Sequence, residues 1–157
     1  ANHCKTTAKY CEFVCKELGV DQQTTKQIVQ AARIHDFGKI LIDVTSHKKL
    51  SPEGLDAPAH CLAGAYFCQA FAETSEFAQI IKVHHERNDG SGMPLGLKGD
   101  QLDFPSKVLI ACNAIERLLN TTKDIGATIE QIKANAGIKF DQKVVSAIEA
   151  IVSRIGK

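Results

Sequence analysis

Apolar positions recur along most of the chain at the three- and four-residue intervals of an amphipathic α-helix. In residues 24–35, one helix face is formed by Ile28, Ala31, Ala32 and His35, at positions i, i+3, i+4 and i+7. The same period predicts further helices over residues 3–18, 59–72, 75–85, 105–120, 128–136 and 141–155. No segment has a convincing strand pattern, and there is no internal repeat. The pattern therefore predicts an all-α fold.

Residues with known preferences for helix ends divide these segments. We expect Gly19 to end the first helix and Thr24 or Thr25 to cap the second. We expect Gly38 to mark the end of the second helix and to loosen the chain there, so that neighbouring side chains can turn inward. The segment Ser51-Pro52-Glu53 is typical of a helix start.

Residues 88–104 are the one long stretch in which glycine and proline replace helix-forming residues. Loops longer than about a dozen residues inside a compact domain are often functional. We therefore expect this loop to lie at a functional site.

The composition narrows the class of protein. With 157 residues, of which 44% are hydrophobic and 24% charged, the chain suits one globular domain over residues 1–157. The net charge of +1 gives no reason to expect a nucleic-acid polymer or an anionic membrane as a partner. The longest apolar run, such as Val108–Cys112, is far too short to span a bilayer. Helical sequence begins directly after Ala1, so we expect the domain to be part of a longer protein.

The cysteines are best explained as buried, reduced side chains that pack as small hydrophobic groups. Cys4, Cys11 and Cys15 fall on one face of the first predicted helix, and Cys61 and Cys68 repeat the same seven-residue spacing. The chain has no CxxC pair and is large enough not to need disulfides. We therefore expect a cytoplasmic protein. A zinc site built from Cys11 and Cys15 is an alternative, although it lacks obvious further ligands.

Histidine and aspartate occur in two short motifs that suit metal chemistry. His35-Asp36 precedes Lys39, and the adjacent His84 and His85 end a predicted helix. Neutral imidazole and carboxylate together suit divalent iron, manganese, nickel or zinc. A single histidine on an apolar helix face is more often a core residue than a ligand. Two such motifs in one short helical chain are much stronger evidence for ligation, and together they predict a metal site.

Longer segments around these motifs match a known family. The segments are His35-Asp36-Phe37-Gly38-Lys39-Ile40, His60 within a helix, residues 84–94 (HHERNDGSGMP), residues 95–99 and residues 137–141. They resemble the HD-GYP branch of the HD-domain phosphohydrolases. The resemblance implies an all-α HD-domain helical bundle of about seven helices, with the long glycine-rich loop at the metal site. It also implies hydrolysis of cyclic di-GMP to the linear dinucleotide or GMP in bacterial second-messenger signalling, with two or three divalent metals, usually iron or manganese. Related members cleave cyclic GMP-AMP.

The resemblance assigns roles to individual residues. The implied metal ligands are His3, His35, Asp36, His60, His84, His85 and Asn113. Asp36 and Lys39 are the implied catalytic residues, because a carboxylate can bridge two metals and a lysine cation can contact the scissile phosphate. The implied substrate contacts are Lys39, Arg87, Gly90, Gly92 and Met93. For the two glycines, a purely structural turn is an equal alternative.

Three segments depart from the family pattern. Asn113 stands where the family usually has an aspartate ligand, so one negative charge is lost. Met93 stands where the family has the tyrosine of its name, so a hydroxyl and an aromatic face are lost. Residues 120–124 replace an Asp-Arg-Pro-Tyr-Arg-like stretch that helps to hold the dinucleotide, and the cations near them are Arg117 and Lys123.

These observations leave more than one function open. We expect a metal-dependent phosphodiesterase that acts on a cyclic dinucleotide, because the histidine set is intact. The alternative is a degenerate HD-GYP module with weak or no catalysis that binds a nucleotide or a protein, which Asn113 and Met93 favour. An HD-type phosphohydrolase acting on a mononucleotide is a third hypothesis, and the motif loop argues against it.

The family resemblance and the last predicted helix suggest further partners. The resemblance implies an upstream sensor or receiver domain in the full-length signalling protein. A homodimer through residues 141–155 is a further hypothesis, although the apolar residues of that segment would serve the core equally well.

Overall fold

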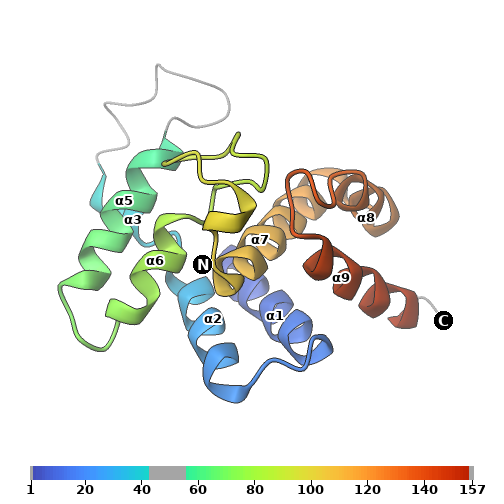
Figure 1. Cartoon of the computed structure of the whole chain (residues 1–157), viewed down its shortest axis with the longest axis horizontal. Coiled ribbons are helices and arrows are strands. Elements are labelled where there is room, and N and C mark those ends of the chain that lie inside the picture. The colour runs from blue at the N-terminus through green and yellow to red at the C-terminus, as the bar shows by residue number, and fades with distance from the viewer. Residues whose placement is uncertain (1, 43–55, 156–157) are drawn as a thin grey trace.

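The computed structural model describes residues 2–42 and 56–155, and the regular structure within them is helical (Figure 1). The α-helices are α1 (Asn2–Glu17), α2 (Gln22–Ile34), α3 (Gly38–Leu41), α5 (Asp56–Gln69), α6 (Ala78–Lys82), α7 (Phe104–Thr122), α8 (Ile125–Lys133) and α9 (Gln142–Ile155). Two short 3-10 helices are η1 (Ser75–Phe77) and η2 (Gly99–Gln101). In the described ranges, β pairing is limited to isolated bridges. The prediction of an all-α fold is confirmed, while the predicted helix start at residues 51–53 lies outside the described residues.

Aspartates cap the helices that the sequence pattern predicted. Asp21 Oδ1 accepts a hydrogen bond of 2.9 Å from the backbone N–H of Thr24, so Asp21 is the N-cap of α2. The prediction that Thr24 or Thr25 caps this helix was therefore wrong, because both already lie in its first turn. Asp103 and Asp124 cap α7 and α8 in the same way. Because Asp124 caps α8, this helix begins earlier than the predicted residue 128.

Gly38 does not end the second helix. α2 ends at Ile34, His35 is its C-cap, and Gly38 begins the short helix α3. A Cβ atom on Gly38 would lie 2.0 Å from the backbone oxygen of His60 and 2.7 Å from the backbone nitrogen of Gly64. The glycine is therefore needed because α3 packs directly against the backbone of α5, and the expected role in loosening α2 was wrong.

The segment predicted as one helix over residues 75–85 is divided. The 3-10 helix η1 leads into α6, which ends at Lys82. His84 and His85 therefore lie just beyond the helix, where the backbone leaves helical geometry. Because these two adjacent residues lie outside a helix, their side chains are not held in the different directions that a helix would impose.

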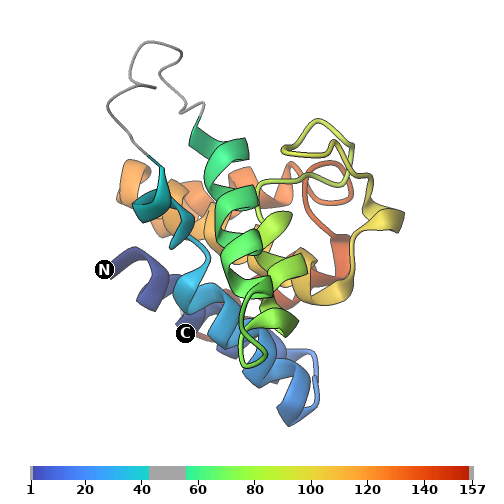
Figure 2. The same ribbon diagram turned by 90° about the vertical axis from the view of Figure 1, so that its left-hand side faces the viewer.

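α7 is the central element of the bundle. It contacts α1, α2, α6, α8 and α9, with α3 and α5 on one side and α8 and α9 on the other (Figure 1). Figure 2 shows α5 beside α6, in agreement with the contact between them. The buried core includes Ile28, Ile80, Leu109 and Ile132 from four different helices. α7 thereby lies between the side of the domain that contains α3 and α5 and the C-terminal helices.

The apolar face of α9 packs into this core. Val144, Val145 and Ile148 are buried, and Ile151 packs against the same cluster. These residues serve the interior of the domain, so they give no separate support for a dimer through α9. The homodimer stays a prediction.

The cysteines are unpaired, and five of the six are buried. Cys11 and Cys15 lie in the apolar core, and burial raises the pKa of both thiols. Neither belongs to a cluster of potential metal ligands in the described part of the chain. Nothing in this part of the chain supports a zinc site there. No helix in the described ranges is long and apolar enough to cross a membrane.

Candidate metal centre

Four histidine side chains from separate parts of the fold meet around one carboxylate, that of Asp36. Asp36 Oδ1 lies 3.7 Å from Nε2 of His35, 3.4 Å from Nε2 of His60 and 3.9 Å from Nε2 of His84. Asp36 Oδ2 lies 3.8 Å from Nε2 of His3. α1, the end of α2, α5 and the segment after α6 each contribute to this cluster. The fold therefore brings residues of the two motifs and two additional histidines to one point.

Backbone hydrogen bonds orient two of these imidazoles. His35 Nδ1 donates to the carbonyl of Ala32 at 2.7 Å, and His84 Nδ1 donates to the carbonyl of Ile81 at 2.6 Å. A carbonyl oxygen can only accept, so Nδ1 carries the proton in both rings. Nε2 of each ring then presents a lone pair toward Asp36. This is the arrangement in which metal-binding histidines are usually held.

The spacing of the nitrogens fits adjacent ligands of one ion. Nε2 of His60 and Nε2 of His84 are 3.2 Å apart, and so are Nε2 of His3 and Nε2 of His35. Two nitrogens bound at about 2.1 Å in neighbouring coordination positions lie about 3.0–3.4 Å apart. His35 and His84 cannot donate from Nε2 when neutral, so each offers an Nε2 lone pair, either to a hydrogen bond from its neighbour or to a bound cation. The residues present therefore fit a divalent-metal site.

The side chains that would bind metal are in the required ionisation states. Burial raises the pKa of Asp36, but hydrogen bonding from His60 and the charges of His35 and Lys39 outweigh it and hold the pKa well below its usual range. Burial lowers the pKa of His35 and lowers that of His84 well below its usual range. At neutral pH, the site therefore offers the anionic carboxylate of Asp36 and the neutral imidazoles of His35 and His84.

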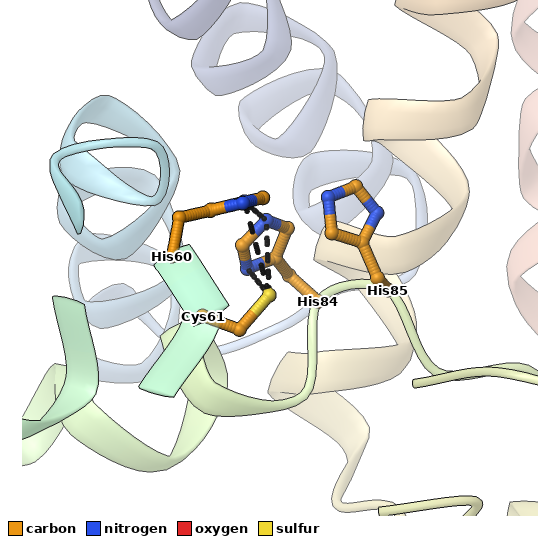
Figure 3. A group of neighbouring side chains, drawn as sticks. All are labelled: His60, Cys61, His84 and His85. Atoms are coloured by element: carbon orange, nitrogen blue, oxygen red, sulfur yellow. Dashed lines mark hydrogen bonds between the residues drawn. The ribbon is translucent and has the colours of Figure 1, made fainter. Parts of the chain in front are cut away.

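His85 and Cys61 complete the second side of the cluster (Figure 3). The His85 ring centroid lies 4.3 Å from that of His84 and 5.2 Å from that of His60. Burial, followed by the charges of His60 and Arg117, lowers the pKa of His85 to about 3. Burial raises the pKa of the Cys61 thiol to about 12. In the absence of metal the thiol is neutral, so His85 is the better ligand of the two.

Asn113 approaches the same site from α7. Its Oδ1 is buried and has no hydrogen-bond partner in the described structure. It lines one cleft together with His84 and His85. A buried amide oxygen without a donor is costly unless a ligand satisfies it. The ligand role of Asn113 stays a prediction, and its amide oxygen would bring no charge to a metal.

Glu116 is a site residue that the sequence analysis missed. Its Oε2 accepts a hydrogen bond from Nδ1 of His3, and its Oε1 accepts one of 2.5 Å from Asn120 Nδ2. The Glu116 side chain is buried. The available signal was an acidic residue one helical turn after Asn113, within an apolar stretch. Its carboxylate orients the His3 ring so that Nε2 faces Asp36.

Lys39 lies on the solvent side of the cluster. Its Nζ is 2.7 Å from Asp36 Oδ2, and about half of its side chain is exposed. The cation is therefore paired with the carboxylate and accessible from solvent.

The glycine-rich loop is held by the carboxylate of Glu86. Glu86 is buried and accepts hydrogen bonds from the backbone N–H groups of Leu95, Gly96 and Leu97, at 2.6, 3.1 and 3.0 Å. A Cβ atom on Gly92 would lie 2.3 Å from the Cα atom of Glu86. Glu86 and Gly92 together fold the loop back onto the residues that follow the histidine pair.

The residues predicted to contact substrate divide into two groups. Arg87 and Met93 line the cleft beside His84 and His85. The backbone N–H of Met93 donates to the carbonyl of His85 at 3.1 Å. The other three residues do not line this cleft: Gly92 packs on backbone, Gly90 has a left-handed φ of +79°, and Lys39 lies beside Asp36. For the two glycines, the structure shows turn and packing functions.

A helical bundle that gathers a His-Asp dipeptide and histidines from separate helices around one site defines the class of HD-domain proteins. The comparisons agree with this class, because a sequence profile described as an HD domain matches residues 1–144.

Related proteins and structures carry more specific names. The chain is 32% identical over 120 residues to the 3'3'-cGAMP-specific phosphodiesterase 1 of Vibrio cholerae. The aligned region covers 74% of this chain and 28% of that protein. It is 26% identical over 148 residues to the cyclic di-GMP phosphodiesterase response regulator RpfG of Xanthomonas campestris, covering 87% of this chain and 39% of that protein. The chain thus spans well under half the length of these relatives.

Solved structures confirm the fold. An HDG"Y"P protein from Bdellovibrio bacteriovorus superimposes with a TM-score of 0.79 at 21% identity, over 98% of this chain and 52% of that chain. A cyclic GMP-AMP-specific phosphodiesterase of V. cholerae gives a TM-score of 0.75 at 17% identity, over 96% of this chain and 44% of that chain. The chain belongs to the HD-domain family, and its fold is similar to that of an HDG"Y"P protein.

Proposed function

We propose that this domain is a metal-dependent phosphodiesterase that hydrolyses a cyclic dinucleotide, with cyclic di-GMP as the first substrate to test. The observation that supports the proposal is the convergence of histidine Nε2 atoms on Asp36, with the Nδ1 atoms of His35 and His84 occupied by backbone carbonyls. The names of the relatives, which act on cyclic di-GMP or 3'3'-cGAMP, support the same substrate class.

The chain's own residues would divide the work between binding and charge stabilisation. His3, His35, His60, His84 and His85 would hold divalent metals, iron or manganese, with Asp36 between them and Asn113 as a neutral ligand. Bound metals supply a hydroxide nucleophile at neutral pH and neutralise phosphate oxygens. Lys39, held 2.7 Å from Asp36, would turn its cation toward the scissile phosphate as negative charge develops there.

The proposal is tested by metal content and turnover in the same preparation. Manganese-loaded or reduced-iron-loaded protein is expected to hold close to two metal equivalents and to hydrolyse cyclic di-GMP or 3'3'-cGAMP. His84→Ala removes an Nε2 ligand, so turnover is expected to fall at least about 100-fold with a loss of bound metal. Lys143→Ala on α9 is the matched surface control. Metal-loaded wild-type protein without any turnover of either nucleotide would contradict catalysis.

A regulatory module is the second candidate function. It is favoured by the neutral Asn113 at a ligand position and by Met93, which is 42% exposed where the family has an aromatic side chain. In that case, the cleft would still bind a cyclic dinucleotide or a protein partner without cleaving the nucleotide. Binding measured by calorimetry, together with absent turnover under manganese and iron, would identify this function.

The proposed function also suggests which other domains the full-length protein contains. We propose that residues 1–157 form one catalytic or regulatory domain of a longer cytoplasmic bacterial signalling protein, with a sensor or receiver domain upstream. The relative RpfG is named a response regulator, and the chain covers 39% of it.

A further inference from the structure

A cleft of about 580 Å³ extends from the metal centre toward α8. Its lining includes His84, His85 and Asn113, and also Gln131 from α8 and Asn135 from the residues after α8. The volume falls within the range of about 300–1,000 Å³ that is usual for small-molecule sites. A ligand in this cleft could therefore contact the metal site at one end and α8 at the other.

The cleft has an excess of positive charge. Its lining includes Arg87, Arg117 and Lys139, and none of them forms an ion pair with an acidic residue in the described structure. The acidic residue in the lining is Glu86, whose carboxylate is buried and accepts hydrogen bonds from three loop N–H groups. That carboxylate is directed into the loop, so the three cations are left to attract an anion in the cleft.

The cations come from three elements that the fold brings together. Arg117 lies four residues after Asn113 and thus on the same face of α7. The backbone N–H of Asn88 donates to the carbonyl of Lys139 at 3.0 Å, which ties the segment before α9 to the loop that carries Arg87. The three side chains are therefore positioned by packing and by backbone hydrogen bonding, although they are far apart in sequence.

The family's usual cations are absent from the C-terminal end of α7. Residues 120–124 replace the Asp-Arg-Pro-Tyr-Arg-like stretch, and their one cation is Lys123. Lys123 is the C-cap of α7, with a left-handed φ of 56°, and does not line the cleft. A dinucleotide in this cleft must therefore find its positive charge elsewhere.

We propose that Arg87, Arg117 and Lys139 form a second phosphate subsite, which binds the phosphate of a cyclic dinucleotide that does not lie at the metals. The inference rests on the proposed function. It names the residues that would make the site prefer a ligand with two phosphates. A cyclic dinucleotide carries two phosphodiester groups, so its cleavage at the metal centre places the second anion some distance along the cleft. Charge-assisted contacts from arginine suit this group.

The test compares a substrate with two phosphates and a diester with one. Manganese-loaded wild-type protein, Arg117→Ala and the double variant Arg87→Ala/Arg117→Ala are assayed with cyclic di-GMP and with bis(p-nitrophenyl) phosphate. Dissociation constants for cyclic di-GMP are measured by calorimetry on the same proteins in EDTA. Arg33→Ala on α2 is the matched control, because Arg33 is exposed and does not line the cleft.

We expect the substitutions to weaken binding of the cyclic dinucleotide more than binding of the single diester. Removal of one charge-assisted phosphate contact is expected to raise KM and Kd for cyclic di-GMP about tenfold in Arg117→Ala, and more in the double variant. The rise in KM for bis(p-nitrophenyl) phosphate is expected to be several-fold smaller. Equal effects on both diesters, or a Kd and KM like those of Arg33→Ala, would overturn the subsite.

Failure of the subsite and failure of the proposed function give different results. Tight binding of cyclic di-GMP that depends on Arg117, without turnover, would overturn catalysis and support the subsite. Turnover of cyclic di-GMP with an unchanged KM in both variants would support catalysis and overturn the subsite.

Discussion

Glu116 shows at the residue scale how one buried carboxylate can govern a ligand. It accepts one hydrogen bond from the Nδ1–H group of His3 and another from the side-chain amide of Asn120. With Nδ1 protonated, the Nε2 lone pair of His3 faces Asp36, 3.8 Å away. Carboxylates in this position fix the tautomer of a metal-binding histidine and increase its basicity.

We predict that Glu116→Ala weakens metal binding by roughly 10- to 100-fold, because His3 loses its orienting acceptor. Glu116→Gln keeps an acceptor oxygen and is expected to recover part of the affinity. The measurement is competition for manganese against a chelating dye, with Glu130→Ala, at an exposed position of α8, as the control. A Glu116→Ala protein with wild-type metal affinity would contradict the orienting role.

Asn113 is the second decisive residue. Its Oδ1 is buried and has no hydrogen-bond partner in the described structure, which supports the proposal that it binds a metal, although the amide lacks a negative charge. Asn113→Asp is expected to increase manganese affinity about tenfold or more, since a carboxylate is the harder, charged ligand. Turnover of cyclic di-GMP should rise with occupancy. An unchanged affinity would mean that residue 113 does not ligate metal.

At the scale of the elements, the contact of α3 with α5 positions the motif residues. Gly38 lies against the backbone of His60 and Gly64, so the turn that carries Asp36 is held close to the helix that carries His60. Any side chain at position 38 would push these two elements apart.

Gly38→Ala is therefore predicted to destabilise the domain by about 2 kcal/mol or more, as overpacking against rigid backbone does. Urea unfolding measures the change. Gly126→Ala, in the first turn of α8, is the control: its added methyl would approach the side chain of Asp124 rather than backbone, and we expect a change below about 1 kcal/mol. Equal stability of Gly38→Ala and wild type would show that α3 can shift freely.

At the scale of the whole molecule, several elements bury neutral histidines together. Burial lowers the pKa of His35 and His84, and it lowers that of His85 to about 3 from an ordinary 6.5. The unfolded chain then binds more protons than the folded chain between these two pH values. The free energy of unfolding must rise with pH across that interval.

We predict that the metal-free protein has its full histidine-linked stability above about pH 6.5 and loses it progressively as the pH falls toward 3. Chemical unfolding at a series of pH values in EDTA measures this dependence. His85→Gln should flatten the slope between pH 6.5 and 4, because its neutral side chain adds no proton. A stability that stays constant over this range would contradict the burial of neutral histidines.

Local patterns in the sequence determined the helices and the family. Apolar periodicity located α1, α2, α5, α7 and α9 to within a few residues, because each helix must bury one face. The boundaries were less accurate, since side-chain caps such as Asp21 decide them. Two short motifs pointed to His35, Asp36, His84 and His85, and the family resemblance added His3 and His60; the structure brings these residues together.

Only the tertiary structure decided how these residues are held and what surrounds them. The bond from His3 to Glu116 joins residues 113 positions apart, and the close approach of Gly38 to His60 depends on how two helices pack. The grouping of Arg87, Arg117 and Lys139 likewise depends on the path of three separate elements. Periodicity tells which face of a helix is buried, whereas the partner that this face meets is set by the packing of the whole bundle.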